Sequence, residues 1–241
     1  MKISEITVDY IKHMGNDLSV VNAARVSFHK ESTMEWGERP VTEKDREDNA
    51  FPEYPIERIE CWKLRASDEK LINYLAKHKH FSPFNHTFLT FKIKAPIFVA
   101  RQLQKHRFMP WNEVSRRYVD EEPEFYIPKE WRGRPVNSKQ GSDGILEDKF
   151  ISLAFRNHLD YALVEYNSML QDGVAPEQAR MALPQAMMTE WWWSGTLGAY
   201  ADMLRLRLDP HTQYESRIVA NLIHKEIQKL FPISIKALLN D

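Results

Sequence analysis

The feature that most constrains the fold is a strand followed directly by a helix near the middle of the chain. Residues 87–95 alternate between apolar and more polar side chains, a period of two that predicts a half-buried β-strand. Pro96 then occupies the first position of the next segment, where proline favours the start of a helix. Pro110 ends that helix, so we expect helical structure from Pro96 to Arg107.

The other segments contain few strands and several long helices. At 241 residues the chain has the length of one large domain, so we expect residues 1–241 to form a single domain. This order of elements predicts an α+β fold in which long helices flank an antiparallel sheet. We predict strands at 3–11, 125–127 and 187–193, a long loop at 29–55, and helices at 17–27, 56–64, 67–79, 146–172, 175–183, 196–208 and 212–231.

The composition excludes several classes of protein. The net charge is −1 with 28% charged residues, so no global positive field indicates a nucleic-acid partner. Cys61 is the single cysteine, which excludes an intramolecular disulfide framework and a multi-cysteine metal site. No apolar run approaches transmembrane length, and residues 1–27 lack the pattern of a signal peptide. We therefore expect a cytoplasmic protein without a membrane partner, in the host cytoplasm if the source is a virus.

The segment QLQKHRFMPWNEVSRRY, residues 102–118, concentrates polar side chains at the end of the predicted helix. In a helix, Gln102, Lys105 and His106 would share one face, because positions i, i+3 and i+4 are neighbours. One interpretation of KHR alone is a solvated basic helix end, where cations complement the helix dipole.

The residues after Pro110 favour a binding site instead. In an extended chain, Glu113, Ser115 and Arg117 would share one face, because side chains alternate with period two. The two polar rows would then meet at one corner with cations, a carboxylate, an amide and a hydroxyl. Such a corner suits a phosphorylated ligand that also forms hydrogen bonds.

The order of these residues resembles the signature of flavin-dependent thymidylate synthases. That signature is Arg-His-Arg, seven residues and Ser, and here KHR (105–107) is followed by FMPWNEV and Ser115. Lys105 keeps the charge but lacks the planar fork of arginine, so a bidentate contact there would weaken. Residues 29–67 and 131–144 depart from the family pattern as local insertions. Five other blocks resemble the family in order: MGNDLSVVNAARVSF (14–28), HFSPFNH (80–86), KAPIFVARQ (94–102), ARMALP (179–184) and LRLDPHTQYE (206–215).

The resemblance implies a fold, a reaction and an assembly. The reaction is reductive methylation of dUMP to dTMP, with carbon from methylenetetrahydrofolate and hydride from FAD that NADPH has reduced. In such a protein the hard redox step belongs to the cofactor, and the chain supplies binding and orientation. The implied assembly is a homotetramer whose active sites are shared between subunits, with small-molecule substrates and no nucleic acid.

The resemblance also implies roles for individual residues. Arg207 matches the arginine placed against the uracil edge, where a fixed cation stabilises negative charge on the pyrimidine. Ser115 is the second candidate catalytic residue, and we assign it to orienting the substrate because no histidine is placed in the sequence to activate it. Arg180 is expected to reach in from a neighbouring subunit. The implied dUMP-binding residues are Gln102, Lys105, Glu113, Ser115, Arg117, Arg180 and Arg207.

A second set of positions matches flavin contacts in the family. Thr196 and Gly198 stand where many relatives have bulkier polar residues, which leaves backbone contacts to the flavin at this turn. The implied FAD-binding residues are Ser27, His80, Ser82, Lys105, His106, Arg107, Asn112, Glu113, Thr196, Gly198, Asp202 and His211.

Two alternatives to this enzyme stay open from the residues alone. One is a catalytically inactive relative kept as a scaffold. The other is a module that binds RNA or single-stranded DNA through a basic patch with aromatic stacking. Its platform would consist of Lys105, Arg107, Arg116 and Arg117 with Trp111 and Tyr118.

Other chemistry-bearing residues have structural interpretations. His78, His80 and His86 suggest a zinc site, but no further ligand at suitable spacing completes the set, so we expect no metal. Cys61 lacks a Pro-Cys-His context, and we expect a structural thiol. The apolar run 191–193 is expected to be core.

Overall fold

The computed structural model describes most of the chain and divides it into two compact units. The described residues are 1–41, 58–118, 121–136, 141–147 and 149–239. Unit 1 comprises Met1–Lys12, Thr90–Gly195 and Asp202–Ile223. Unit 2 comprises His13–Leu89, Thr196–Ala201 and His224–Asp241. Among the described residues, no helix is both long and apolar enough to span a membrane.

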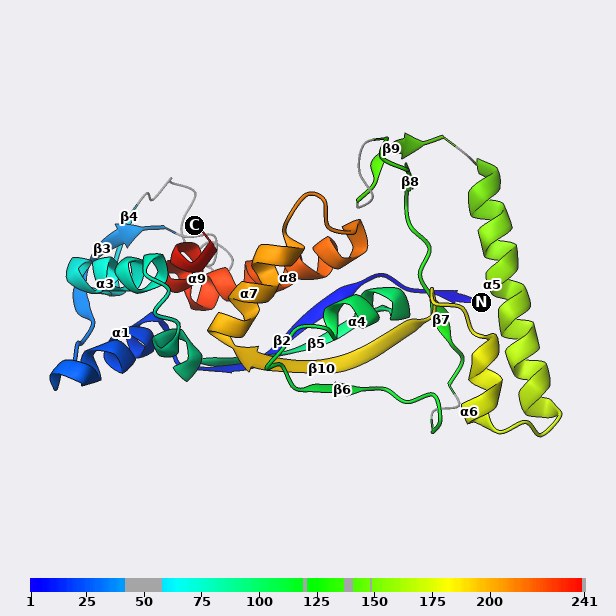
Figure 1. Cartoon of the computed structure of the whole chain (residues 1–241), viewed down its shortest axis with the longest axis horizontal. Helices are drawn as coiled ribbons and strands as arrows, with labels where there is room; N and C mark the ends of the chain where they lie inside the picture. The colour runs from blue at the N-terminus through cyan, green and yellow to red at the C-terminus, as the bar shows by residue number, and fades with distance from the viewer. Residues whose placement is uncertain (42–57, 119–120, 137–140, 148, 240–241) are drawn as a thin grey trace. The chain divides into compact units, whose positions relative to one another are not determined.

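A four-stranded sheet, most of which belongs to unit 1, has the strand order β2-β5-β10-β6 (Figure 1). The side chains of β5 alternate as predicted, with Leu89, Phe91 and Ile93 fully buried. Strands β10 and β6 pair in antiparallel fashion, with Trp191 opposite Glu113. The strands are β2 (Thr7–Met14), β5 (Phe88–Pro96), β6 (Trp111–Glu113) and β10 (Met188–Thr196).

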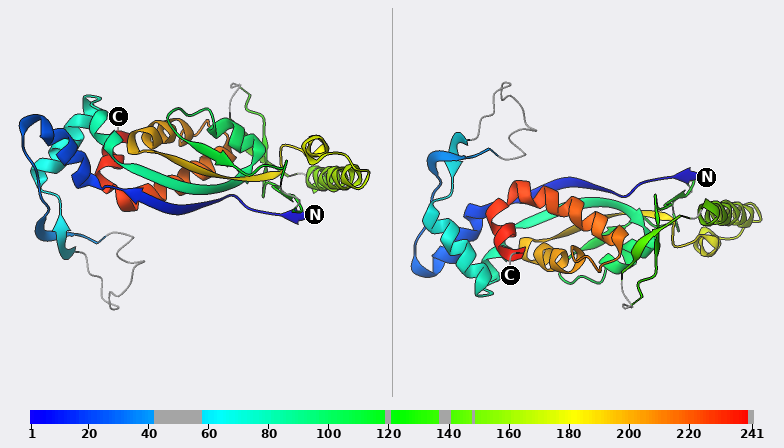
Figure 2. Two further views of the ribbon diagram at one scale, coloured as in Figure 1. Left: turned by 90° about the horizontal axis from the view of Figure 1, so that it is seen from below. Right: turned by 90° about the horizontal axis from the view of Figure 1, so that it is seen from above.

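Two helices of unit 1, α5 (Lys149–Gln171) and α6 (Pro176–Ala179), lie side by side (Figures 1 and 2). Helix α5 contributes Leu159 and Leu163 to a buried cluster that also contains Phe125. Burying large side chains of this kind stabilises each by about 1.5–3 kcal/mol. The other helices with residues in unit 1 are α4 (Ile97–Leu103), α7 (Leu197–Arg207) and α8 (Tyr214–Leu230).

Two small sheets complete unit 1. Strands β1 (Lys2–Ile3) and β7 (Glu124–Phe125) pair in parallel. Strands β8 (Trp131–Gly133) and β9 (Asp143–Leu146) pair in antiparallel fashion within the insertion predicted at 131–144. The mixed helix and sheet composition confirms the predicted α+β class.

Buried carboxylates join the helices of unit 2. Asp17, at the start of α1 (Asp17–Arg25), accepts hydrogen bonds from the backbone N–H groups of Ile233 (3.0 Å) and Ser234 (2.9 Å). These donors lie in the first turn of α9 (Pro232–Leu239), where a carboxylate satisfies otherwise unpaired N–H groups. Asp68, in α3 (Ala66–Lys77), is fully buried and forms an ion pair with Arg25.

Several sequence predictions are wrong in detail. The helix predicted at 56–64 is strand β4 (Arg58–Lys63), which pairs with β3 (Glu35–Pro40) inside the predicted loop 29–55. The exposure of β4 alternates residue by residue, so the short segment has strand periodicity that its apolar content concealed. The part of both predictions that falls on residues 42–57 lies outside the described residues.

Candidate functional site

The helix that leads into the polar segment is shorter than predicted. Helix α4 ends at Leu103, and the His106 N–H donates to the Leu103 carbonyl at 3.1 Å in a tight turn. Phe108 follows with a positive φ of 60°, a left-handed conformation that breaks the helix before Pro110. The prediction that Gln102, Lys105 and His106 share a helix face is therefore wrong.

The extended chain after Pro110 is also shorter than predicted. Strand β6 stops at Glu113, and the Tyr118 N–H donates to the Ser115 carbonyl at 3.0 Å, which makes residues 115–118 a turn. Glu113, Ser115 and Arg117 therefore do not form one extended row.

One group of predicted residues comes together around Arg207, at the end of α7. Its Nε donates to Nε2 of His106 at 3.0 Å, and its Nη2 donates to the Gln102 carbonyl at 3.3 Å. All three residues belong to unit 1, although more than one hundred positions separate Arg207 from the other two. We call this group the Arg207 cluster.

The Arg207 cluster holds its histidine uncharged. Burial lowers the pKa of His106 to about 4, and the positive charge of Arg207 adds to this effect. At neutral pH the imidazole is therefore neutral, and its Nε2 accepts the hydrogen bond from Arg207, so the proton resides on Nδ1. A neutral acceptor fixes the guanidinium without cancelling its charge.

Gln102 leaves one acceptor without a partner in the same cluster. Its side-chain Oε1 is buried and has no hydrogen-bond partner among the described residues. A buried acceptor without a donor costs about 1–3 kcal/mol, and a ligand N–H placed there would remove that cost. The Arg207 cluster therefore offers a guanidinium and an unpaired amide oxygen to a ligand.

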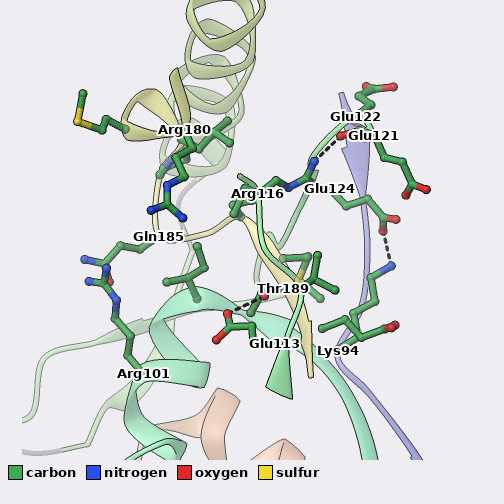
Figure 3. Close-up of a pocket in the computed structure, with 18 residues that line it drawn as sticks. Lys94, Arg101, Glu113, Arg116, Glu121, Glu122, Glu124, Arg180, Gln185 and Thr189 are labelled. Carbon is green, nitrogen blue, oxygen red and sulfur yellow. Dashed lines mark hydrogen bonds and ion pairs between the residues drawn. The ribbon is translucent and has the colours of Figure 1, made fainter. Parts of the chain in front are cut away.

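A second group lines a pocket of about 590 Å³ in unit 1 (Figure 3). Glu113 points into it, and its carboxylate accepts hydrogen bonds from Thr189 Oγ1 at 2.7 Å and from Trp111 Nε1 at 3.0 Å. Figure 3 also shows the guanidinium groups of Arg101 and Arg180 close to Gln185. We call this group the Glu113 pocket, and it combines a fixed carboxylate with arginines that suit an anionic ligand.

Ser115 and Arg117 contact each other, and Arg117 also contacts Tyr118. The Ser115 Oγ accepts from the backbone N and the Nε of Arg117, both at 3.4 Å. The Arg117 guanidinium lies 5.0 Å from the centroid of the Tyr118 ring. Among the described residues, no hydrogen bond joins the Ser115 hydroxyl to a histidine that could act as its general base.

The residues matched to flavin contacts are divided between the units. In unit 2, the Thr196 hydroxyl donates to Asn85 Oδ1 at 2.8 Å and accepts from the Ala199 N–H at 3.2 Å. A Cβ at Gly198 would lie 2.4 Å from the same Asn85 oxygen, so a side chain there would displace the Asn85 amide. Unit 2 holds Ser27, His80, Ser82, Thr196 and Gly198, and unit 1 holds Lys105, His106, Arg107, Asn112, Glu113, Asp202 and His211.

Several of these flavin positions are exposed to solvent. Lys105 and Arg107 are exposed cations for which the structure describes no ion pair. Asp202 pairs with Arg205 at 2.6 Å, and His211 contacts Asp209 at 3.1 Å. Across the described part of the chain, no group of three His, Cys, Asp or Glu residues is arranged to hold a metal ion.

The sequence reasoning missed the residues that orient Glu113 and extend its pocket. Thr189 lies in the predicted strand 187–193, and its side chain is buried, yet its hydroxyl donates to Glu113. Trp111 was considered only as a stacking residue. Arg101 carried no sequence pattern that separates it from an ordinary exposed helix residue.

Comparison with known proteins gives a consistent result. The family model described as thymidylate synthase complementing protein matches residues 9–233. Flavin-dependent thymidylate synthases of Thermus thermophilus (36% identity over 94% of this chain and 73% of the relative) and Kosmotoga olearia (35%, 95% and 88%) are similar. A crystal structure of the UMP/dUMP methylase PolB from Streptomyces cacaoi bound with 5-Br dUMP has a TM-score of 0.78 and 29% identity, and covers 98% of this chain and 96% of that one. Since the match extends over nearly all of the sequence, the chain belongs to the family of flavin-dependent thymidylate synthases.

Proposed function

We propose that the protein catalyses the reductive methylation of dUMP to dTMP, with methylenetetrahydrofolate as carbon donor and with FAD reduced by NADPH. Membership of the flavin-dependent thymidylate synthase family supports the reaction class. The observation that carries the proposal is the Arg207 cluster, where a neutral His106 and the backbone carbonyl of Gln102 hold the guanidinium, and where the buried side-chain oxygen of Gln102 has no partner among the described residues.

The Arg207 cluster matches the edge of a uracil ring in its hydrogen-bonding groups. The Gln102 oxygen would accept the ring N–H, and the remaining guanidinium N–H groups would donate to a ring carbonyl oxygen. When C5 of the pyrimidine attacks an electrophilic carbon, negative charge develops on the ring, and a fixed cation stabilises it. The neutral state of His106 leaves the whole positive charge of Arg207 available for this purpose.

The Glu113 pocket supplies groups of a different kind. Arg180 is exposed, and its Nε donates to the backbone carbonyl of Glu177 at 3.2 Å, which leaves its Nη atoms for a ligand. Two such N–H groups match the oxygens of a phosphate monoester and fix its orientation as well as its charge. Arg117 and the Ser115 hydroxyl would add further donors to the phosphate.

We propose that the Arg207 cluster and the Glu113 pocket of different subunits combine into one active site within a homotetramer. The predicted nucleotide-binding residues form two separate groups in one chain, which supports a shared site. A symmetric oligomer brings such groups together in trans, because each interface repeats the same pairing.

The residues at the flavin positions fit a dinucleotide cofactor in their chemistry. Lys105 and Arg107 are exposed cations that would pair with a diphosphate. When bound, the flavin would supply the hydride, while the chain would orient the pyrimidine and exclude water.

A product assay tests this proposal. Purified protein incubated with dUMP, methylenetetrahydrofolate and NADPH is expected to form dTMP, detected by chromatography with mass spectrometry. Leaving out any one of the three should stop product formation. Colourless protein that forms no dTMP but binds oligonucleotides in a salt-sensitive manner would support the nucleic-acid module instead.

Thr189→Val tests the orientation of Glu113. The valine removes one of two hydrogen-bond donors to the carboxylate, so the KM for dUMP should rise about tenfold with a smaller change in kcat. Thr90→Val is the matched control, because Thr90 is also buried in the sheet but hydrogen-bonds Ser194 at 3.0 Å. Equal KM values for the two variants would show that Thr189 does not act through Glu113.

Ser115→Ala tests whether the hydroxyl orients the substrate or attacks it. Because only Arg117 is seen to donate to this hydroxyl, the variant should keep turnover within about tenfold of the parent. Steady-state kinetics and dUMP affinity measured by calorimetry provide the readout. Complete loss of turnover with unchanged dUMP affinity would instead identify Ser115 as a nucleophile.

A further inference from the structure

A second cavity of unit 1, of about 820 Å³, lies apart from the residues assigned to nucleotide and flavin. Six separate segments of the chain line it, including α4, β8 and the start of α8. None of its lining residues belongs to the Arg207 cluster or to the predicted flavin positions. Its volume falls in the range of about 300–1,000 Å³ that is typical of small-molecule sites.

The walls of this cavity are aromatic and held in place. Trp131 donates from its indole N–H to Ser152 Oγ of α5 at 2.8 Å, and it meets Phe155 edge to face at 5.3 Å. Phe98 and Tyr126 form a second edge-to-face pair at 6.3 Å. Fixed aromatic walls suit a flat ring, because stacking needs no rearrangement of the protein.

Two charged residues that line the cavity, Arg132 and Glu215, pair with each other. Arg132 pairs with the buried carboxylate of Glu215 and donates from its Nε to Ser142 Oγ at 3.0 Å. Its guanidinium also lies 4.1 Å from the centroid of the Tyr214 ring. The Arg132–Glu215 pair carries little net charge, so it does not favour a strongly anionic ligand.

Three polar side chains of the cavity remain for a ligand. No hydrogen bond or ion pair of the described residues engages the Glu130 carboxylate, the Gln213 amide or the Tyr126 hydroxyl. Burial raises the pKa of Tyr126 to about 12, with the charge of Glu215 as a further cause, so the hydroxyl keeps its proton. The cavity therefore offers an acceptor from Glu130, a donor from Tyr126 and both from Gln213.

We propose that this cavity binds a purine base, carried by a nucleoside or nucleotide, stacked against Trp131 and read by Glu130, Gln213 and Tyr126. A carboxylate accepts only, so the ligand must present N–H donors on its edge, as the amino group of adenine does. A phenol that donates needs an acceptor, which the unsubstituted ring nitrogens of a purine supply. Uracil lacks the amino group, which separates this ligand from the proposed substrate of the active site.

Calorimetry and tryptophan fluorescence of the full chain, titrated with adenosine, test the proposal. Adenosine should bind and quench part of the emission, and uridine should do neither. Glu130→Gln should weaken adenosine binding about tenfold, because an acceptor with full charge is replaced by a neutral amide. Trp131→Phe should lose most of the quenching but keep its calorimetric affinity within about threefold, since a flat wall remains.

The controls separate this site from the active site. Glu147→Gln, an exposed glutamate that does not line the cavity, should bind adenosine as the parent does. Saturating dUMP should leave adenosine binding unchanged. The proposal is overturned if adenosine gives no heat of binding, or if uridine binds as tightly as adenosine. It is also overturned if dUMP displaces adenosine, or if Glu130→Gln and Glu147→Gln weaken adenosine binding equally.

Discussion

Arg207→Ala is expected to lower the rate of dTMP formation by about 10²–10³-fold, the usual cost of removing one preorganised donor to developing negative charge. The alanine removes the guanidinium that His106 and the Gln102 carbonyl hold in place, and no other cation occupies the described Arg207 cluster. Flavin binding should persist, because the variant keeps Lys105 and Arg107, the cations proposed to pair with the diphosphate. Single-turnover kinetics with the flavin content measured in parallel provide the readout.

One control variant and one further measurement make this result specific. Arg156→Ala removes an exposed arginine of α5 that belongs to neither the Arg207 cluster nor the Glu113 pocket, and it should keep parental turnover. In Arg207→Ala, the pKa of His106 should rise from about 4, because one of the two causes that lower it is gone, as a nuclear magnetic resonance titration would show. Turnover of Arg207→Ala near the parental level would refute the assignment of Arg207 to the uracil edge.

Mixing two inactive variants should restore activity if sites are shared between subunits. Arg180→Ala and Arg207→Ala are each expected to be inactive in this case. In randomly mixed oligomers, about one quarter of the sites combine an intact Arg207 of one copy with an intact Arg180 of another, so about one quarter of parental activity should return. Coexpression with two affinity tags, followed by purification on both, yields the mixed oligomers for kinetic assay.

A double variant is the control for this recovery. Mixed with Arg207→Ala, the Arg180→Ala/Arg207→Ala chain offers no site with both arginines and should stay inactive. If tagged mixed oligomers form but recover no activity, then both arginines act within one subunit or one of them is dispensable.

The strand and helix at residues 87–103 could be predicted because their pattern is local. Period-two burial in β5 and the proline at 96 decide the structure within a few residues. The end of the helix could not be predicted from Pro110 alone, because the chain leaves the helix at Leu103 through a left-handed residue at Phe108. A short apolar segment such as 56–64 is equally consistent with helix and strand until its partner β3 is known.

The candidate site was predictable in its residue types but not in its geometry. The contact of Arg207 with His106 joins residues 101 positions apart, and only the family resemblance connected them in advance. The role of Thr189 follows from the register of β10 against β6, which places its hydroxyl beside Glu113, and no spacing in the sequence encodes that register. Long-range pairing therefore decided which of the candidate residues lie together.

The most direct test of the account is an anaerobic titration of the purified protein with dUMP, followed through its visible absorption. We predict a yellow protein whose flavin band shifts as dUMP binds and bleaches when NADPH is added, because uridylate and flavin would occupy one site. A colourless protein, or a flavin band that dUMP leaves unchanged at saturation, would contradict the proposal that the two rings meet beside Arg207.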